Sequence, residues 1–92
     1  MKINFYATLR PIVGGKTIEM PEAPGMSVSQ ILEALVARFP GLQKELFRAD
    51  GTLWSHVHFF INGRDARYLD AGLDYVVQPE DTINIFPPVG GG

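Results

Sequence analysis

Residues 27–39 read SVSQILEALVARF, and this stretch predicts the helix around which the rest of the fold is arranged. Its apolar residues recur at intervals of three and four, which places them along one side of a helix. These residues are Val28, Ile31, Leu32, Leu35, Val36 and Phe39. Ser27 with Gln30 matches the capping box of a helix start, and Pro40-Gly41 predicts the helix end. A helix with one apolar side must cover a second apolar layer.

Segments with alternating apolar and polar residues predict strands on both sides of this helix. The predicted strands are residues 2–7, 17–20, 57–61, 75–77 and 82–86. We expect a loop between the first two, because residues 11–15 contain a proline and two glycines. Asn62-Gly63 is a strong hairpin signal. Residues 42–47 predict one short helical turn that buries both of its leucines.

The element order predicts an α+β fold, in which a mixed sheet of four to five strands is covered on one face by one main helix. This roll is the β-grasp arrangement of ubiquitin, where the first and last strands lie side by side and parallel. The last strand is then central, and the chain beyond it leaves from the middle of the sheet. We expect a β-grasp domain over residues 1–86 and a flexible C-terminal tail over residues 87–92.

The alternation also predicts which side chains face the helix. The inward-facing residues are Ile3, Phe5, Val57, Phe59, Ile61, Ile83 and Ile85. Tyr6, Phe60 and Phe86 face the other side, which a single helix cannot cover. Three aromatic side chains on neighbouring strands would form an exposed apolar patch beside the tail, and such patches usually mark interfaces. The alternative is that loops or a dimer bury them.

The composition predicts a soluble globular protein, since 46% of the residues are hydrophobic and 20% are charged. No apolar run is long enough to span a membrane, and the start lacks a signal-peptide pattern, so we expect a cytoplasmic protein without a membrane partner. The net charge is −2 and Lys and Arg do not cluster, which argues against direct binding of nucleic acid. Cysteine is absent, which excludes disulfides, thiolate metal sites and a cysteine nucleophile.

Other polar residues give little indication of catalysis or metal binding. His56 and His58 would share one strand face, but a metal would need a third ligand from Asp or Glu, so we expect no bound metal or cofactor. Neither paired carboxylates nor a nucleophile motif is evident. We expect solvated surface charges at Arg10, Arg64 and Arg67. Trp54 is expected to cover the core edge beneath its loop.

The last six residues, PPVGGG at 87–92, carry the strongest functional signal. Pro87 and Pro88 cannot extend a central strand, and glycines without a Cβ let another backbone approach closely. At roughly 3.3–3.6 Å per residue, the extended tail reaches about 20 Å. The ionised carboxylate of Gly92 resists nucleophiles until it is activated, for example as an acyl adenylate made from ATP by a partner enzyme. The alternative is a frayed terminus or a linker remnant.

Over essentially its whole length, the chain resembles the MoaD/ThiS family of ubiquitin-like sulfur carriers. The matching segments are Phe5–Arg10, Ile61–Gly63, Pro79–Asp81 and Ile83–Gly92. Within the family, Thr8–Pro11, Gly14-Gly15 and the long loop Arg48–Ser55 are similar to the CysO-type carriers of cysteine biosynthesis.

The resemblance implies that a ubiquitin-activating-type adenylyltransferase consumes ATP to adenylate Gly92, which is then converted to a thiocarboxylate. Its sulfur would pass to a cysteine-synthase-type enzyme, to the large subunit of molybdopterin synthase, or to a thionucleoside pathway. The protein would be a cosubstrate and not an enzyme; in molybdopterin synthase it would be a non-catalytic subunit. The family diglycine maps onto Gly91-Gly92, and Gly90 replaces the usual small residue such as alanine. We expect Pro87, Pro88 and Val89 to contact the partner together with the aromatic patch.

The sequence is also compatible with two other functions. A ubiquitin-like modifier, joined to lysines of target proteins through Gly92, begins with the same acyl adenylate. A non-reactive interaction domain would need no activation at all.

Overall fold

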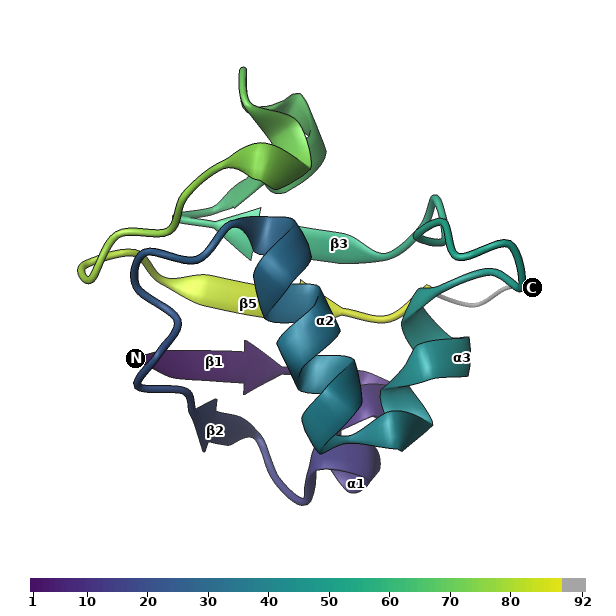
Figure 1. Ribbon diagram of the computed structural model, residues 1–92. Coiled ribbons are helices and arrows are strands. Elements are labelled where there is room, and N and C mark those ends of the chain that lie inside the picture. Colours follow the sequence, from purple (N-terminus) through teal and green to yellow (C-terminus); the bar gives the residue numbers. More distant parts are fainter. Residues whose placement is uncertain (89–92) are drawn as a thin grey trace.

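The computed structural model describes residues 1–88, and helix α2, Val28–Arg38, lies across one face of its sheet (Figure 1). Both halves of the predicted capping box form. The Ser27 hydroxyl accepts from the Gln30 backbone N–H at 3.1 Å, and the Gln30 side chain accepts from the Ser27 N–H at 2.8 Å. These two bonds satisfy N–H groups that a helix start leaves without partners.

The sheet has five strands in the order β2-β1-β5-β3-β4. Their bounds are Lys2–Phe5 for β1, Thr17–Glu19 for β2, His58–Ile61 for β3, Arg64–Asp65 for β4 and Ile83–Phe86 for β5. β1 pairs with β5 in parallel, and the other neighbours are antiparallel. The last strand is therefore central, and the predicted β-grasp fold is confirmed.

Strand alternation builds the core as predicted. All the inward-facing residues of the predicted set are buried: Ile3, Phe5, Val57, Phe59, Ile61, Ile83 and Ile85. From α2 they meet the buried side chains Val28, Ile31, Leu32 and Leu35. Ile85 pairs with Phe5 on one side and with Phe59 on the other, so β5 joins the two halves of the sheet through the core.

The predicted loop after β1 is wrong, because this segment is helical. The strand ends at Phe5, two residues earlier than predicted, and Ala7 is exposed with a left-handed φ of 52°. A 3-10 helix, Ala7–Leu9, and helix α1, Arg10–Val13, follow and bury Leu9 and Val13. Pro11 stands in the first turn of α1, where proline needs no N–H partner, and Gly14 ends it at φ 85°. The proline and the glycine are thus helix signals here.

The predicted strand at residues 75–77 is also wrong. Val76 forms an isolated bridge with Ser27 and is exposed, while the fifth strand is β4. β4 follows the predicted hairpin turn, whose residues Asn62 and Gly63 both have positive φ, at 53° and 85°, as a type I′ turn requires. Two 3-10 helices, Ala66–Tyr68 and Gly72–Asp74, occupy the segment after it.

The short helical turn after α2 is confirmed. It consists of a 3-10 helix, Pro40–Leu42, and helix α3, Gln43–Leu46, and it buries both leucines. Within residues 1–88, none of the helices is long and apolar enough to cross a membrane.

Candidate functional site

The candidate site lies where β5 ends. The strand stops at Phe86, in front of the two prolines, of which Pro87 is buried and Pro88 is half-buried. The predicted reactive residue Gly92, with Val89, Gly90 and Gly91, lies outside the described residues. The division of the chain at residue 86 and the flexibility of its tail therefore remain predictions.

The aromatic cluster, which consists of Tyr6, Phe60 and Phe86, lies on the sheet face opposite α2, as predicted. Tyr6 directly follows β1, Phe60 belongs to β3 and Phe86 is the last residue of β5. The rings of Tyr6 and Phe86 stack with centroids 4.1 Å apart, and Phe60 meets Phe86 edge-on at 5.4 Å. Each ring is half-buried, because the rings cover one another. The cluster is a continuous aromatic surface beside the tail exit, and its role in partner binding remains a prediction.

Polar groups hold one side of the aromatic cluster in place. The Tyr6 hydroxyl donates to the Asn84 side-chain oxygen at 3.0 Å. Arg10 donates from Nε to the Phe5 carbonyl at 2.8 Å, and its guanidinium carbon lies 5.1 Å from the centre of the Tyr6 ring. Arg10 is therefore not the solvated charge expected from the sequence: it is half-buried, and it places a fixed cation at the edge of the cluster.

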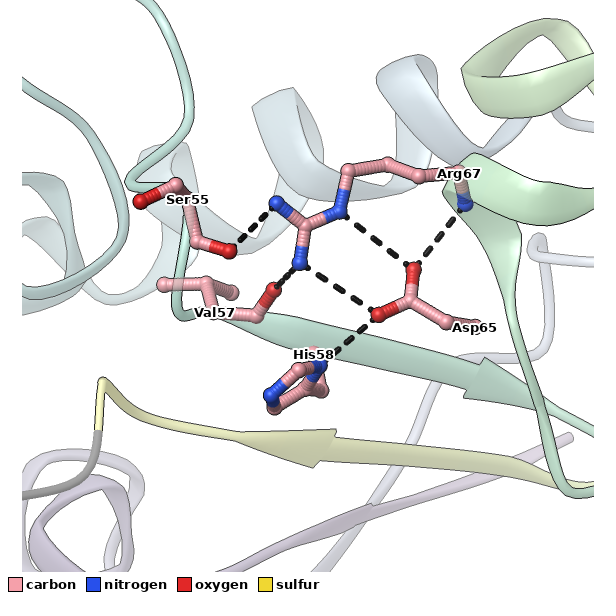
Figure 2. Close-up of polar contacts among 5 residues, drawn as sticks. All are labelled: Ser55, Val57, His58, Asp65 and Arg67. Carbon is pink, nitrogen blue, oxygen red and sulfur yellow. Dashed lines mark hydrogen bonds and ion pairs between the residues drawn. The ribbon is translucent and has the colours of Figure 1, made fainter.

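On the other side of the cluster, a buried carboxylate binds two side chains, as Figure 2 shows. Asp65 is 7% exposed, and its Oδ2 lies 2.8 Å from His58 Nδ1 and 3.3 Å from Arg67 Nη2. Arg67 also donates to the carbonyl oxygens of Ser55 and Val57, just before β3. Arg67 is half-buried in this network, so its expected exposure is wrong as well, whereas Arg64 is exposed as predicted. The imidazole of His58 in turn stacks on Phe60, with centroids 5.5 Å apart.

The charge state of Asp65 follows from its contacts. Burial alone would raise the pKa of Asp65, but hydrogen bonds from His58 and Arg67 outweigh it and hold the pKa below the usual range of a carboxyl. The carboxylate is therefore ionised at neutral pH and acts purely as an acceptor. Sequence reasoning missed this network. The hairpin signal at Asn62-Gly63 could have placed Asp65 beside β3, because the turn fixes which residues of β3 and β4 lie across from each other, but it does not place Arg67.

The two histidines do not share a site. His58 binds Asp65, whereas His56 is exposed and lines a hollow of about 410 Å³ at the tail exit. The hollow is formed by Lys44, Glu45, Trp54, His56 and Pro88. In the part of the chain that the structure describes, no three His, Asp or Glu residues come together as metal ligands.

Trp54 does not cover the core edge as expected, because its side chain is 38% exposed. Its indole N–H donates to the Lys44 carbonyl at 3.2 Å, and the Arg48 guanidinium lies over the ring at 4.9 Å. The indole and Pro88 thus form part of one surface beside the tail.

Comparison with known proteins agrees with this architecture. The ThiS family model matches residues 3–92. Small archaeal modifier protein 3 of Haloferax volcanii is 35% identical over 92 residues, which cover 100% of this chain and 98% of that protein. The crystal structure of SAMP1 from Haloferax volcanii superposes with a TM-score of 0.80 at 30% identity, covering 99% of this chain and 97% of that one.

A solved protein complex contains a chain with nearly the same degree of similarity. A chain of the Amycolatopsis orientalis BexX/CysO complex gives a TM-score of 0.76 at 29% identity, covering 99% of this chain and 98% of that one. The family model covers nearly the whole chain, and proteins named as small archaeal modifiers share its sequence and its fold. The protein belongs to the ThiS family of small ubiquitin-like sulfur carriers and modifiers, which are not themselves catalytic enzymes.

Proposed function

We propose that this protein carries sulfur as a thiocarboxylate on Gly92. The observation that carries the proposal is the course of β5, which lies at the centre of the sheet and ends at Phe86 and two prolines. The chain beyond it leads to the glycines from the middle of the molecule. Because none of the 92 residues is cysteine, the terminal carboxyl is the group on which this protein can hold sulfur.

The chemistry requires two steps on a partner enzyme. A carboxylate oxygen of Gly92 attacks the α-phosphate of ATP, which releases pyrophosphate and leaves an acyl adenylate. Hydrosulfide, as the sulfur nucleophile, then forms a C–S bond to the carbonyl carbon, AMP departs with the oxygen, and loss of a proton from the thioacid leaves the thiocarboxylate. The residues of this chain present the tail and bind the enzyme, and ATP is bound and consumed by the ubiquitin-activating-type adenylyltransferase.

The aromatic cluster is the surface on which we propose that this enzyme docks. Tyr6, Phe60 and Phe86 lie directly beside the start of the tail, so an enzyme that holds the cluster receives the tail at a defined place. Pro87, Pro88 and Val89 then pass along the same enzyme. Half-buried aromatic residues at the centre of a contact commonly supply most of its binding free energy.

For the sulfur acceptor, we propose a cysteine-synthase-type enzyme. The proposal rests on the segments Thr8–Pro11, Gly14-Gly15 and Arg48–Ser55, and on the similarity to the CysO chain of the BexX/CysO complex. The test is to supply the thiocarboxylated protein to each purified acceptor system in turn. Sulfur transfer to a molybdopterin precursor or to a tRNA base, without transfer to the cysteine-synthase-type enzyme, would refute this choice.

A second candidate function is conjugation to lysines of other proteins through Gly92. It is favoured by the similarity to small archaeal modifier proteins 3 and 1, which are 35% and 30% identical over the full chain. Intact mass measurement after isolation from the native cell distinguishes the two functions. Exchange of one oxygen for sulfur indicates a carrier, and high-mass adducts indicate a modifier. An unmodified chain with no adducts contradicts both and supports a non-reactive interaction domain.

A further inference from the structure

An imidazole lies at the rim of the aromatic cluster and extends its surface with a polar group. The ring of His58 stacks on Phe60 with an interplanar angle of 16°, and Phe60 contacts Phe86 edge-on. In the sheet, His58 is the register partner of Phe86, the last residue before the prolines. The His58 side chain is 38% exposed, so a protein that covers the cluster also covers this imidazole.

The orientation of the imidazole is fixed from behind by the buried carboxylate. His58 Nδ1 lies 2.8 Å from Asp65 Oδ2, within hydrogen-bond distance. Arg67 binds the same carboxylate through its backbone N–H and its guanidinium (Figure 2). Because the ionised Asp65 can accept but not donate, Nδ1 carries the proton in this contact. In the neutral imidazole, Nε2 then has a lone pair and is an acceptor.

We propose that His58 is a specificity determinant of the docking surface, and that its Nε2 accepts a hydrogen bond from a backbone N–H, hydroxyl or amide donor of the enzyme that activates Gly92. The inference rests on the proposed function and adds the chemistry of the partner surface. Apolar contact on the aromatic cluster discriminates weakly between similar surfaces. An oriented acceptor beside it discriminates strongly, because a partner without the matching donor would bury Nε2 unpaired.

Two substitutions separate the roles of the two ring nitrogens. His58→Asn keeps an N–H close to the position of Nδ1, where it can still donate to Asp65, and it removes Nε2. His58→Gln keeps an amide close to the position of Nε2 and loses the short bond to Asp65. Glu33→Gln, an exposed residue of α2 on the opposite face of the sheet, is the control.

The assay is ATP–pyrophosphate exchange by the purified activating enzyme of the same cell, at increasing concentrations of this protein, with thermal unfolding of each variant in parallel. We expect His58→Asn to raise KM about three- to tenfold, the range for one hydrogen bond, with kcat and the melting temperature unchanged. We expect His58→Gln to lower the melting temperature and to keep KM closer to that of the wild type. Glu33→Gln should alter neither quantity.

The outcomes are distinct. If His58→Asn has the wild-type KM, or if KM rises in both variants in step with the loss of melting temperature, His58 is structural and the inference fails while the proposed function stands. If the wild-type protein supports no exchange at all, the proposed function fails and this inference fails with it.

Discussion

Replacing Asp65 with asparagine tests the contacts that hold the candidate site together. The substitution keeps the side-chain oxygen that accepts from the Arg67 backbone N–H at 3.0 Å, and asparagine is also a good helix cap. It removes the negative charge and places an amide where Oδ2 accepts from His58 and Arg67. Asp65→Asn therefore removes the charge of the carboxylate while nearly preserving the size and shape of the side chain, so it tests the charged hydrogen bonds alone.

The expected loss of stability follows from these two contacts. Hydrogen bonds to a charged group contribute about 1.5–3 kcal/mol each. His58 and Arg67 are 38% and 30% exposed, so water replaces part of what they lose. We expect the free energy of unfolding to fall by about 2–3 kcal/mol, a large share of the roughly 5–14 kcal/mol expected for 92 residues. For a chain of this size, the melting temperature should fall by roughly 10–20 °C.

The loss should also depend on pH in a defined direction. The pKa of Asp65 is lowered in the folded state, so its contribution is fully present above the unfolded value of about 3.8. This contribution to the free energy of unfolding is lost as the pH falls through the pKa of Asp65 in the folded state, because the carboxyl is then protonated in the folded protein as well. Urea unfolding of wild type and Asp65→Asn should therefore differ most at neutral pH, and the difference should shrink in strong acid.

Asp70→Asn is the matched control, since Asp70 is an exposed carboxylate on the segment that follows the network. It should alter the free energy of unfolding by less than about 0.5 kcal/mol. Equal stability of the Asp65 and Asp70 variants at neutral pH would refute the reasoning. A penalty at Asp65 that persists unchanged in acid would show that shape, and not charge, is responsible.

Three further predictions concern the tail, the aromatic cluster and the main helix. Deleting Gly91 and Gly92 should abolish ATP-dependent activation and leave the melting temperature nearly unchanged; continued pyrophosphate exchange would refute Gly92 as the reactive residue. Phe60→Ala and Phe86→Ala should weaken binding of the activating enzyme by about 1–3 kcal/mol in titration calorimetry. Phe86→Ala should also lower the free energy of unfolding more than Phe60→Ala, because Phe86 stacks on Tyr6 at 4.1 Å, closer than Phe60 stacks on His58 at 5.5 Å; unaltered affinity would show that the cluster is structural. Ser27→Ala should cost about 1 kcal/mol in urea unfolding, and no loss would mean that the capping box contributes nothing to stability.

The parts of the fold that the sequence predicts well are those that repeat with a period. Helix α2 and the alternation of β1, β3 and β5 each show their buried face within one continuous segment, so local pattern is enough. β4 consists of Arg64 and Asp65, too short for any period, and its position depends on pairing with β3. Residues 75–77 have strand-like side chains, but their backbone hydrogen bonds go to residues 25–28 at the start of α2, where Val76 forms an isolated bridge with Ser27.

The segment after β1 shows how the same residues allow two interpretations. Pro11 and Gly14 are common in loops, but they are equally typical of the first turn and the end of a helix. The buried side chains of Leu9 and Val13 decide between these outcomes, because a helix of one turn lets both reach the core. That decision depends on contacts with distant residues, which the local sequence does not contain.

Part of the candidate site also follows from local pattern, and part depends on contacts between distant residues. The face of the aromatic cluster follows from alternation alone, whereas the network of His58, Asp65 and Arg67 requires the hairpin register. Phe60 pairs with Asp65 across the turn at Asn62-Gly63, so Asp65 lies on the same sheet face as Phe60 and as His58, two residues earlier on β3. Arg67 lies beyond the end of β4, in a 3-10 helix, and binds the carboxylate of Asp65 from there. The register was available from the turn, but the burial of Asp65 depends on how Arg67 folds over it, and no sequence pattern specifies that.

The network also couples the stability of the fold to the geometry of docking. Arg67 holds the Ser55 and Val57 carbonyls just before β3, and β3 pairs with β5 along the strand that leads to the tail. Loss of Asp65 would release this attachment and the imidazole at the rim of the cluster together, so both folding stability and enzyme binding should suffer. We expect removal of Gly91 and Gly92 to abolish activation and to leave folding stability nearly unchanged. A variant that loses stability and enzyme binding together is therefore altered in the surface that presents the tail. A variant that loses only activation is altered in the group that reacts.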